Sequence, residues 1–244
     1  RELKTAMGKI IFKHTELYYK ELWSAFDKTD LREDGKIWDM YSSLTDFTFQ
    51  KNQCGSYKKE GDCYNREHSF PKSWFNDGYP MYTDLNHLYP TDGKINGMRG
   101  NDPFGEVGSS ASGSYQDFSR WGTCVYPGYS GKVFEPNDMY KGDFARTYFY
   151  MVTCYEDSLY KWKSDMLDRS AYPAFTEWAM NMLLEWSRED PVSKKEIDRN
   201  NAVYEIQGNR NPFIDYPQLA EYIWGNKKGE IFNGLSSVNV EFAD

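Results

Sequence analysis

Residues 65–101 read NREHSFPKSWFNDGYPMYTDLNHLYPTDGKINGMRGN, and this stretch holds most of the unusual polar chemistry of the chain. It contains two of the three histidines of the sequence, His68 and His87, and each of them is followed by a proline three residues later. Its many Gly, Asn, Pro and Asp residues are typical of short elements joined by functional turns. We therefore expect a strand, strand, helix module around the two histidines.

The residue types beside the histidines point to metal-assisted chemistry. Glu67 and His87 are of types that ligate divalent ions, and a histidine such as His68 has an ordinary pKa near 6.5, which suits a general base. If Glu67 and His68 alternate on a strand, one holds a metal while the other faces an attacking water. The alternative interpretation of this stretch is a solvated, turn-rich loop. A single histidine, such as His14, is more often structural than catalytic.

A helix is expected after the second histidine. Thr91 or Asp92 is placed to cap about three turns of helix. Its side chains include several that can hold phosphate or support metal ligands: Lys94, Asn96, Arg99 and Asn101.

The rest of the chain predicts a mainly helical α+β fold. Apolar residues recur at helical spacing from Leu3 to Phe26, which predicts one N-terminal helix. Other expected elements are helices near 138–155, 174–188, 194–207 and 216–224, strands near 121–126 and 132–134, and a long loop over 31–64. No Pro/Gly/Ser-rich linker divides the chain, so we expect a single domain over residues 1–244.

Composition excludes several classes of protein. With 244 residues, of which 39% are hydrophobic and 18% aromatic, the chain is neither disordered nor fibrous. No apolar run reaches the roughly 20 residues of a membrane span, so we expect none. The opening residues 1–4 do not resemble a signal peptide, although a removed leader would leave no trace. The net charge of −8 provides no global basic field for nucleic acid, so any chemistry on a polyanion must be local.

The four cysteines form no C-x-x-C pair of the metal-binding or redox kind. Their even number and loop-like settings predict two disulfides and an oxidising compartment, with four reduced thiols as the alternative. Cys54 and Cys63 bracket a short turn-like segment and are expected to pair. Cys124 pairs with Cys154 only by elimination, because four cysteines allow three connectivities.

Four pieces of sequence resemble the bacterial endonuclease I family and occur in the order found in that family. They are residues 65–74 (NREHSFPKSW), 84–101 together with 103–107 (PFGEV), 142–146 (GDFAR) and 207–213 (QGNRNPF). The resemblance covers roughly residues 20–225. It implies the ββα-metal, or His-Me finger, nuclease fold, with the module at about residues 60–107 embedded in a larger helical domain.

The resemblance also implies roles for the residues of the module. His68 corresponds to the general base, Glu67 to a metal ligand, and His87 to the second ligand position. The family commonly has an Asp-x-His-Asn order with asparagine as the ligand, whereas residues 84–87 read DLNH, so a shifted register makes Asn86 the ligand. We favour His87, because the proline after it fixes the alignment and related HNH-type fingers use histidine there.

Arg99 is our candidate for holding the scissile or adjacent phosphate, because a guanidinium matches phosphate with two hydrogen bonds. Secondary candidates for substrate binding are Arg66, Asn96, Asn101 and Arg210.

The implied activity is a metal-dependent, non-specific endonuclease that cleaves DNA, with RNA also open, and leaves 5′-phosphate products. The expected cofactor is one divalent ion, Mg²⁺ in the first place, while an imidazole ligand leaves Mn²⁺, Ca²⁺ or another transition ion open. Nucleic acid is the expected partner, without an obligate protein partner. The expected location is secreted, periplasmic or at the cell surface.

Charge and aromatic content support two rival functions. Residues 65–120 carry five basic and seven acidic side chains, whereas a basic surface is typical of proteins that bind nucleic acid. The 43 aromatic residues suit a carbohydrate- or ligand-binding module, although helical spacing favours core packing for most of them. The second rival is a catalytically inactive relative of the nucleases used as a binding protein, because His87 replaces the asparagine that the family commonly has.

Overall fold

The computed structural model describes residues 1–234, and the chain in it divides into two compact units. Residues 17–140 form one unit, which we call the central unit, and it holds the named strands. The chain on either side, residues 1–16 and from 141 onward, forms the other, which we call the helical unit. The predicted α+β class is confirmed. That one domain spans residues 1–244 stays a prediction.

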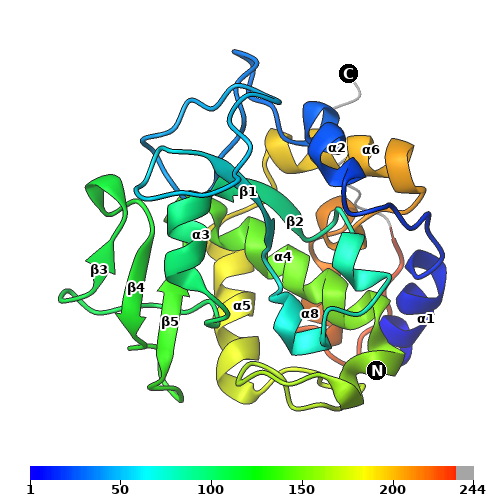
Figure 1. Cartoon of the computed structure of the whole chain (residues 1–244). Helices are drawn as coiled ribbons and strands as arrows, with labels where there is room; N and C mark the ends of the chain where they lie inside the picture. Colours follow the sequence, from blue (N-terminus) through cyan, green and yellow to red (C-terminus); the bar gives the residue numbers. More distant parts are fainter. Residues whose placement is uncertain (235–244) are drawn as a thin grey trace. The chain divides into compact units, whose positions relative to one another are not determined.

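An antiparallel hairpin and a helix form the heart of the central unit (Figure 1). Strand β1 covers Tyr64–His68, β2 covers Leu88–Asp92, and α3 (Gly93–Arg99) follows β2 directly and contacts both strands. The register pairs Glu67 with Tyr89. This is the ββα arrangement that the sequence predicted, within the predicted limits of 60–107.

Helix α3 begins with the predicted cap. The side chain of Asp92 accepts a hydrogen bond from the backbone N–H of Ile95 at 2.9 Å, which satisfies one of the donors that a helix start leaves open. The helix has seven residues, fewer than the three turns expected, because Gly100 leaves helical geometry with a φ of +58°. Asp92, one of the two predicted capping residues, is therefore the cap.

A second antiparallel sheet and short helices complete the central unit. Its strands are β3 (Ser112–Gly113), β4 (Arg120–Thr123) and β5 (Lys132–Glu135), in the order β3-β4-β5. The helices are α2 (Glu21–Thr29) and the 3-10 turns η1 (Lys72–Phe75), η2 (Met81–Thr83) and η3 (Tyr115–Asp117). The predicted long loop is confirmed, since residues 31–63 contain only isolated bridges.

The first disulfide is confirmed and lies against the ββα module. Cys54 and Cys63 are bonded, nine residues apart in the chain. A side chain placed on Gly93 would come within 2.5 Å of the sulfur of Cys54, so the disulfide packs closely on the start of α3. It therefore fastens the long loop to the module.

The second predicted disulfide is wrong. Cys124 and Cys154 are both buried thiols. Each is held within its own unit: the thiol of Cys154 donates to the carbonyl of Ile11 at 3.7 Å, and the backbone of Cys124 bridges to Val107. Pairing these two cysteines by elimination failed, because that argument takes no account of the contacts that each cysteine makes in the folded chain.

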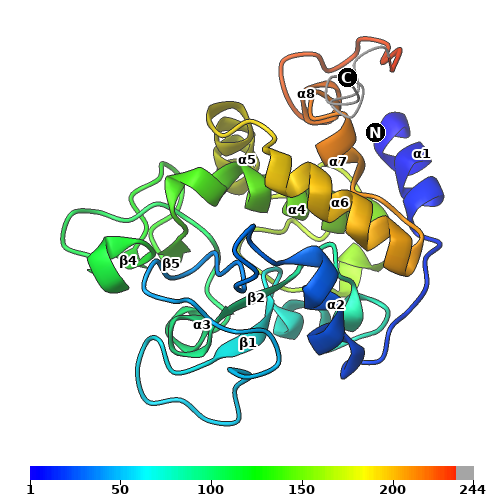
Figure 2. The same cartoon turned by 90° about the horizontal axis from the view of Figure 1, so that it is seen from above.

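Helices make up the other unit, as predicted. Figure 2 shows α4 (Asp138–Cys154) beside α6 (Lys194–Gln207), both close to their predicted bounds, and α5 (Glu177–Glu189). Helix α5 starts three residues later than predicted, because Phe175 bridges back to Leu167. Shorter elements are η4 (Glu156–Lys161), α7 (Pro212–Asp215) and α8 (Leu219–Ile223), of which α8 lies within the predicted final helix. No helix within residues 1–234 combines the length and hydropathy of a membrane span.

The single N-terminal helix predicted over Leu3–Phe26 is wrong, and two helices, α1 (Glu2–Ile11) and α2, take its place. Tertiary hydrogen bonds replace the helical ladder where α1 ends. The carbonyl of Ile11 accepts from the side chain of Asn209 at 2.9 Å, and the N–H of Thr15 donates to the carbonyl of Gln207 at 2.8 Å. The apolar spacing alone gave no sign of these partners.

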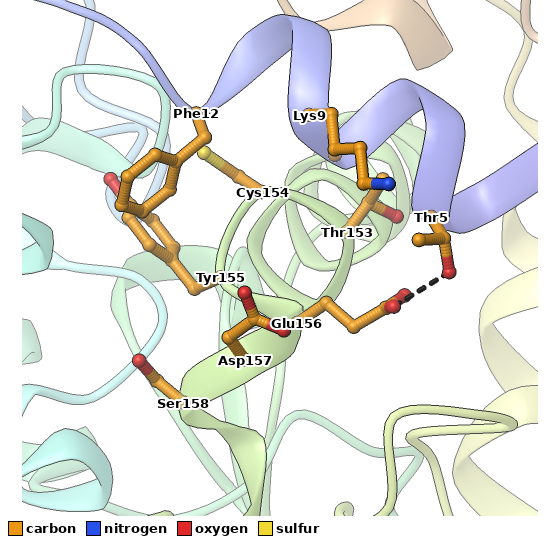
Figure 3. Close-up of a pocket in the computed structure, with 10 residues that line it drawn as sticks. Thr5, Lys9, Phe12, Thr153, Cys154, Tyr155, Glu156, Asp157 and Ser158 are labelled. Carbon is orange, nitrogen blue, oxygen red and sulfur yellow. Dashed lines mark hydrogen bonds between the residues drawn. The ribbon is translucent and has the colours of Figure 1, made fainter.

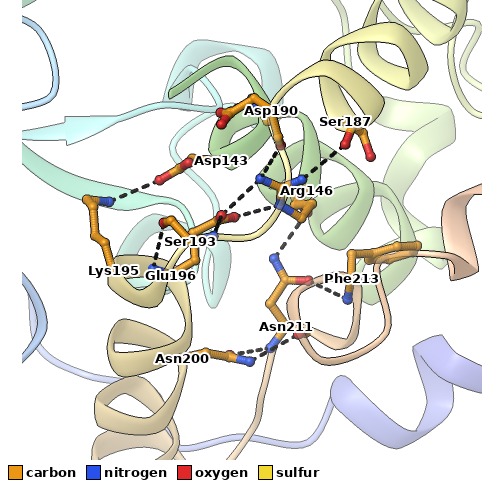
Figure 4. A network of polar contacts seen from close by, with 11 residues as sticks. Asp143, Arg146, Ser187, Asp190, Ser193, Lys195, Glu196, Asn200, Asn211 and Phe213 are labelled. Carbon is orange, nitrogen blue, oxygen red and sulfur yellow. Dashed lines mark hydrogen bonds and ion pairs between the residues drawn. The ribbon is translucent and has the colours of Figure 1, made fainter. Parts of the chain in front are cut away.

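A buried ion pair joins two helices of the helical unit (Figure 4). The guanidinium of Arg146 on α4 contacts both carboxylate oxygens of Glu196 on α6, at 2.6 and 2.9 Å, and donates to the carbonyl of Asp190 at 2.9 Å. The side chain of Asn211 donates to the carbonyl of Arg146 at 3.1 Å. Two of the family-like pieces, 142–146 and 207–213, thus meet in a structural network.

Replacing Arg146 by methionine is expected to lower the free energy of unfolding by about 3–5 kcal/mol, because it leaves the buried carboxylate of Glu196 unpaired. Arg188→Met is the matched control, since Arg188 also binds one carboxylate through two nitrogens but is 41% exposed. The control should lose about 1 kcal/mol or less. Urea titrations of both variants measure the difference, and equal losses would contradict a special role for Arg146.

Alkylation is expected to modify two cysteines when the unfolded chain has not been reduced, and four after reduction. The reason is that Cys54–Cys63 is the disulfide and the other two cysteines remain thiols. Intact-mass measurement counts the adducts. No adduct without reductant would show that Cys124 and Cys154 are also paired.

Candidate active site

A cavity of about 240 Å³ opens over the hairpin and α3 in the central unit. The residues that line it include five of the candidates from the sequence, together with Lys72, which was not among them: Arg66, Glu67, His68, Asn96 and Asn101. The hairpin supplies the first three, and α3 with the turn after it supplies the last two. The ββα fold thus brings together residues that lie up to 35 positions apart in the sequence.

His68, at the end of β1, is held in the tautomer of a general base. Its Nε2 lies 2.9 Å from the carbonyl oxygen of Tyr82. A carbonyl only accepts hydrogen bonds, so Nε2 carries the proton and Nδ1 of the neutral ring is the acceptor. Burial, with the neighbouring ring of His87, lowers the pKa of His68 to about 3, so the ring is neutral near pH 7. The ring is therefore oriented with Nδ1 as its acceptor, while the lowered pKa makes it a weak base.

Glu67 is a buried carboxylate, only 4% exposed, with one oxygen supported and the other open. Nη1 of Arg99 lies 3.8 Å from its Oε1, and the hydroxyl of Tyr41 hydrogen-bonds to the carboxylate. Burial raises the pKa of Glu67 to about 7, although Arg99 and Tyr41 oppose the rise. Oε2 is buried and has no hydrogen-bond partner among the described residues. Such an oxygen is costly unless a cation or a donor reaches it.

Arg99 lies inside the protein and not at the cavity surface. Its side chain is 0% exposed, its guanidinium carbon lies 3.9 Å from the ring centre of Phe104, and Nη1 donates to the hydroxyl of Tyr41 at 2.9 Å. A fully buried guanidinium does not reach a polyanion, so the predicted phosphate contact of Arg99 needs correction. In this structure Arg99 balances the charge of Glu67.

His87 is also fully buried, and its ring is engaged elsewhere. Its Nε2 lies 2.6 Å from the carbonyl of Met81, and the same argument makes that nitrogen the donor. The alternative ligand, Asn86, is buried too, and its backbone N–H donates to Asp84. The same argument makes Nδ1 of His87 the acceptor of the ring, so His87 as the second ligand, with Asn86 as the alternative, stays a prediction. Asn96, which the sequence analysis treated as a substrate contact or as support for metal ligands but not as a ligand itself, lines the cavity. Its position one turn after the Asp92 cap was the feature of the sequence that could have identified it as a candidate ligand.

The secondary candidates for substrate binding differ in the partners that already hold their side chains. Arg66 lies over two rings, 3.7 Å from the centre of Tyr19 and 4.2 Å from that of Trp23, and no carboxylate pairs with it within residues 1–234. Asn101 is exposed at the cavity. Arg210 lies in the helical unit, where two of its nitrogens bind Asp215 at 2.7 Å. The structure thus leaves Arg66 and Asn101 at the site and ties Arg210 to a structural pair.

A second cavity, of about 310 Å³, lies in the helical unit between α1 and the end of α4 (Figure 3). Two carboxylates line it, Glu156 and Asp157, and that of Glu156 is already satisfied by the hydroxyl of Thr5 at 2.7 Å and the ammonium group of Lys4 at 2.6 Å. No histidine lines this cavity within the described residues. Acid–base chemistry therefore points to the cavity of the central unit.

Comparison with known proteins gives consistent results. A family model described as Endonuclease I matches residues 1–218. The extracellular ribonucleases of Bacillus amyloliquefaciens and Bacillus subtilis (strain 168) are each 36% identical, over 229 and 231 residues, or 91% of this chain and 73% and 74% of theirs. An extracellular deoxyribonuclease of Aeromonas hydrophila is 27% identical over 137 residues, or 55% of this chain and 50% of that protein.

Proposed function

Because the chain belongs to the endonuclease I family, we propose that it hydrolyses phosphodiester bonds of nucleic acids at the cavity around His68. The observation that carries this proposal is the pair formed by His68 and Glu67. One is a neutral imidazole with its Nδ1 as acceptor, and the other is a buried carboxylate with an unsatisfied oxygen in the same cavity. A base beside an anionic metal ligand is the arrangement that metal-assisted hydrolysis requires.

His68 takes a proton from water at Nδ1, and the carbonyl of Tyr82 holds the ring in place through Nε2. The hydroxide formed attacks phosphorus in line with the leaving 3′ oxygen, which gives a 5′-phosphate product. Arg66 and Asn101 lie where they can bind nonbridging phosphate oxygens. Arg99 and Tyr41 contact the carboxylate of Glu67 and keep it in one orientation.

The residues present fit one divalent ion. Glu67 offers its unsatisfied Oε2, and Asn96 offers an amide oxygen on the opposing wall of the ββα module. Both are hard oxygen donors, so a site that uses them, and not the imidazole of His87, favours Mg²⁺ over softer ions. When bound, the ion supplies positive charge to the phosphate and the leaving oxygen.

The relatives guide the choice of substrate and location. Their names include both ribonucleases and a deoxyribonuclease, and this mechanism does not use the 2′-hydroxyl, so we propose that the chain cleaves both RNA and DNA. The names also describe extracellular proteins, and a disulfide persists in oxidising compartments, which supports secretion.

The packing and orientation of the side chains weaken the case for both rival functions. Large aromatics of the helical unit pack on one another, for example Phe149 on Trp224 with ring centres 5.1 Å apart, so aromatic content gives little support to a sugar-binding surface. An inactive relative would not be expected to keep a correctly oriented base beside an open carboxylate oxygen. We therefore retain the nuclease as the proposed function.

Purified protein is expected to degrade plasmid DNA and RNA in the presence of Mg²⁺ and to stop when a chelator is added. His68→Ala should lower kcat by about a hundredfold or more, because the general base is lost. His14→Ala is the control and should change kcat by about twofold at most, since His14 lies in the other unit. Undiminished cleavage by a folded His68→Ala protein would remove His68 from this role.

Asn96→Ala and Glu67→Gln are each expected to weaken the binding of Mg²⁺ or Mn²⁺ by about tenfold or more, because each removes a ligand oxygen. Titration calorimetry on the folded variants gives the affinities without depending on activity. Asn101→Ala is the control, as it lines the cavity without being assigned to the ion.

His87→Ala should lower the Tm and leave the ion affinity of the folded fraction unchanged, since the ring is buried and bonded to Met81. The reverse pattern, with lost affinity for His87→Ala and normal affinity for Asn96→Ala, would restore His87 as the ligand.

A further inference from the structure

Three tyrosines form a continuous row that leads from the base to the surface of the central unit. The ring centre of Tyr82 lies 4.9 Å from that of His68, 4.8 Å from that of Tyr19 and 5.3 Å from that of Tyr79. Tyr79, at the outer end, is 53% exposed. We call Tyr19, Tyr82 and Tyr79 the tyrosine row.

The inner end of the row carries a cation without a carboxylate. The guanidinium of Arg66 lies on the ring of Tyr19 at 3.7 Å and donates to the backbone carbonyl of that residue at 3.0 Å. It is about half buried, and no acid within residues 1–234 pairs with it. A guanidinium fixed by stacking and left without an anion suits a phosphate group.

The rings of the tyrosine row and the guanidinium of Arg66 together match the base and the phosphate of a nucleotide. Aromatic side chains stack on bases, and this contact contributes strongly to binding of single strands because every base has an aromatic face. In a duplex the bases are stacked on one another and do not reach a ring on the protein surface. The net charge of −8 makes salt-dependent attraction to the phosphate backbone weak, so uncharged contacts gain importance.

We propose that the tyrosine row binds unpaired bases next to the scissile phosphate, with Arg66 on a neighbouring phosphate, so that the enzyme prefers single-stranded over duplex nucleic acid. This inference rests on the proposed nuclease function and specifies its substrate. Stacking on the row would place the strand beside His68, because the central ring of the row, Tyr82, contacts the ring of His68.

Tyr79 is the residue on which to test the proposal. Among the described residues its ring contacts only that of Tyr82, whereas Tyr82 supplies the carbonyl that orients His68, and Tyr19 supports Arg66. A change at Tyr79 thus removes the outer ring of the row and leaves the catalytic contacts in place. Tyr115, 48% exposed in the same unit, is a matched control, because among the described residues its ring has no contact with the row.

The experiment measures the Kd of the full chain for a fluorescent single-stranded oligothymidylate and for a duplex, by anisotropy, with a chelator present to prevent cleavage. Tyr79→Ala should raise the Kd for the single strand by about 5- to 100-fold and that for the duplex by less than about twofold. Tyr79→Phe, which keeps the ring, and Tyr115→Ala should both match the wild type. The penalty should persist at high salt, as expected for stacking and not for ion pairing.

Equal effects of Tyr79→Ala on single strand and duplex, or no effect on either, would overturn the proposal, as would wild-type affinity that is higher for the duplex. A failure of the proposed nuclease function is distinguishable, because it would be seen as absence of cleavage in Mg²⁺ whatever the binding data show.

Discussion

The active-site region depends on one buried charge, the carboxylate of Glu67. Its removal from water is tolerable only with partners, and these come from separate parts of the central unit: Arg99 from α3 and Tyr41 from the long loop. Asp39 ties the same loop to the module, because its carboxylate accepts from the N–H groups of Tyr41 and Asp92 at 2.9 and 3.1 Å. The loop, which has no regular structure of its own, is thus held against the hairpin by hydrogen bonds.

This arrangement explains why Arg99 matters without touching a substrate. Its position on Phe104 and against Tyr41 directs a positive charge at Oε1 of Glu67, and Oε2 is the oxygen that we propose as the metal ligand. Orientation of a metal ligand by a second layer of contacts is typical of metal sites and affects affinity strongly. Residues that match the family pattern therefore do not all have the same function. The pieces at 142–146 and 207–213 illustrate this, since they build an ion-pair network of the helical unit.

The acidic composition is compatible with a nuclease once binding is considered locally. Arg66 is an unpaired cation at the cavity, and the rings beside it provide contacts that salt does not screen. Weak general attraction to polyanions suits an enzyme that degrades many sequences, because tight binding at each site would slow release. The same balance accounts for the small number of cations beside His68, the base that we propose.

The sequence by itself determined the local features of this protein. The hairpin and the helix after it, the Asp92 cap, the Cys54–Cys63 bond and the helix over 194–207 depend on residues close together in the chain, so pattern and turn chemistry suffice to predict them. Only the tertiary structure decided which way Arg99 points, that His87 is buried on Met81, and that the N-terminal helix ends at Ile11. Burial and hydrogen-bond partners from distant segments set these features, such as Tyr41 for Arg99 and Asn209 for Ile11, and no local pattern encodes such partners.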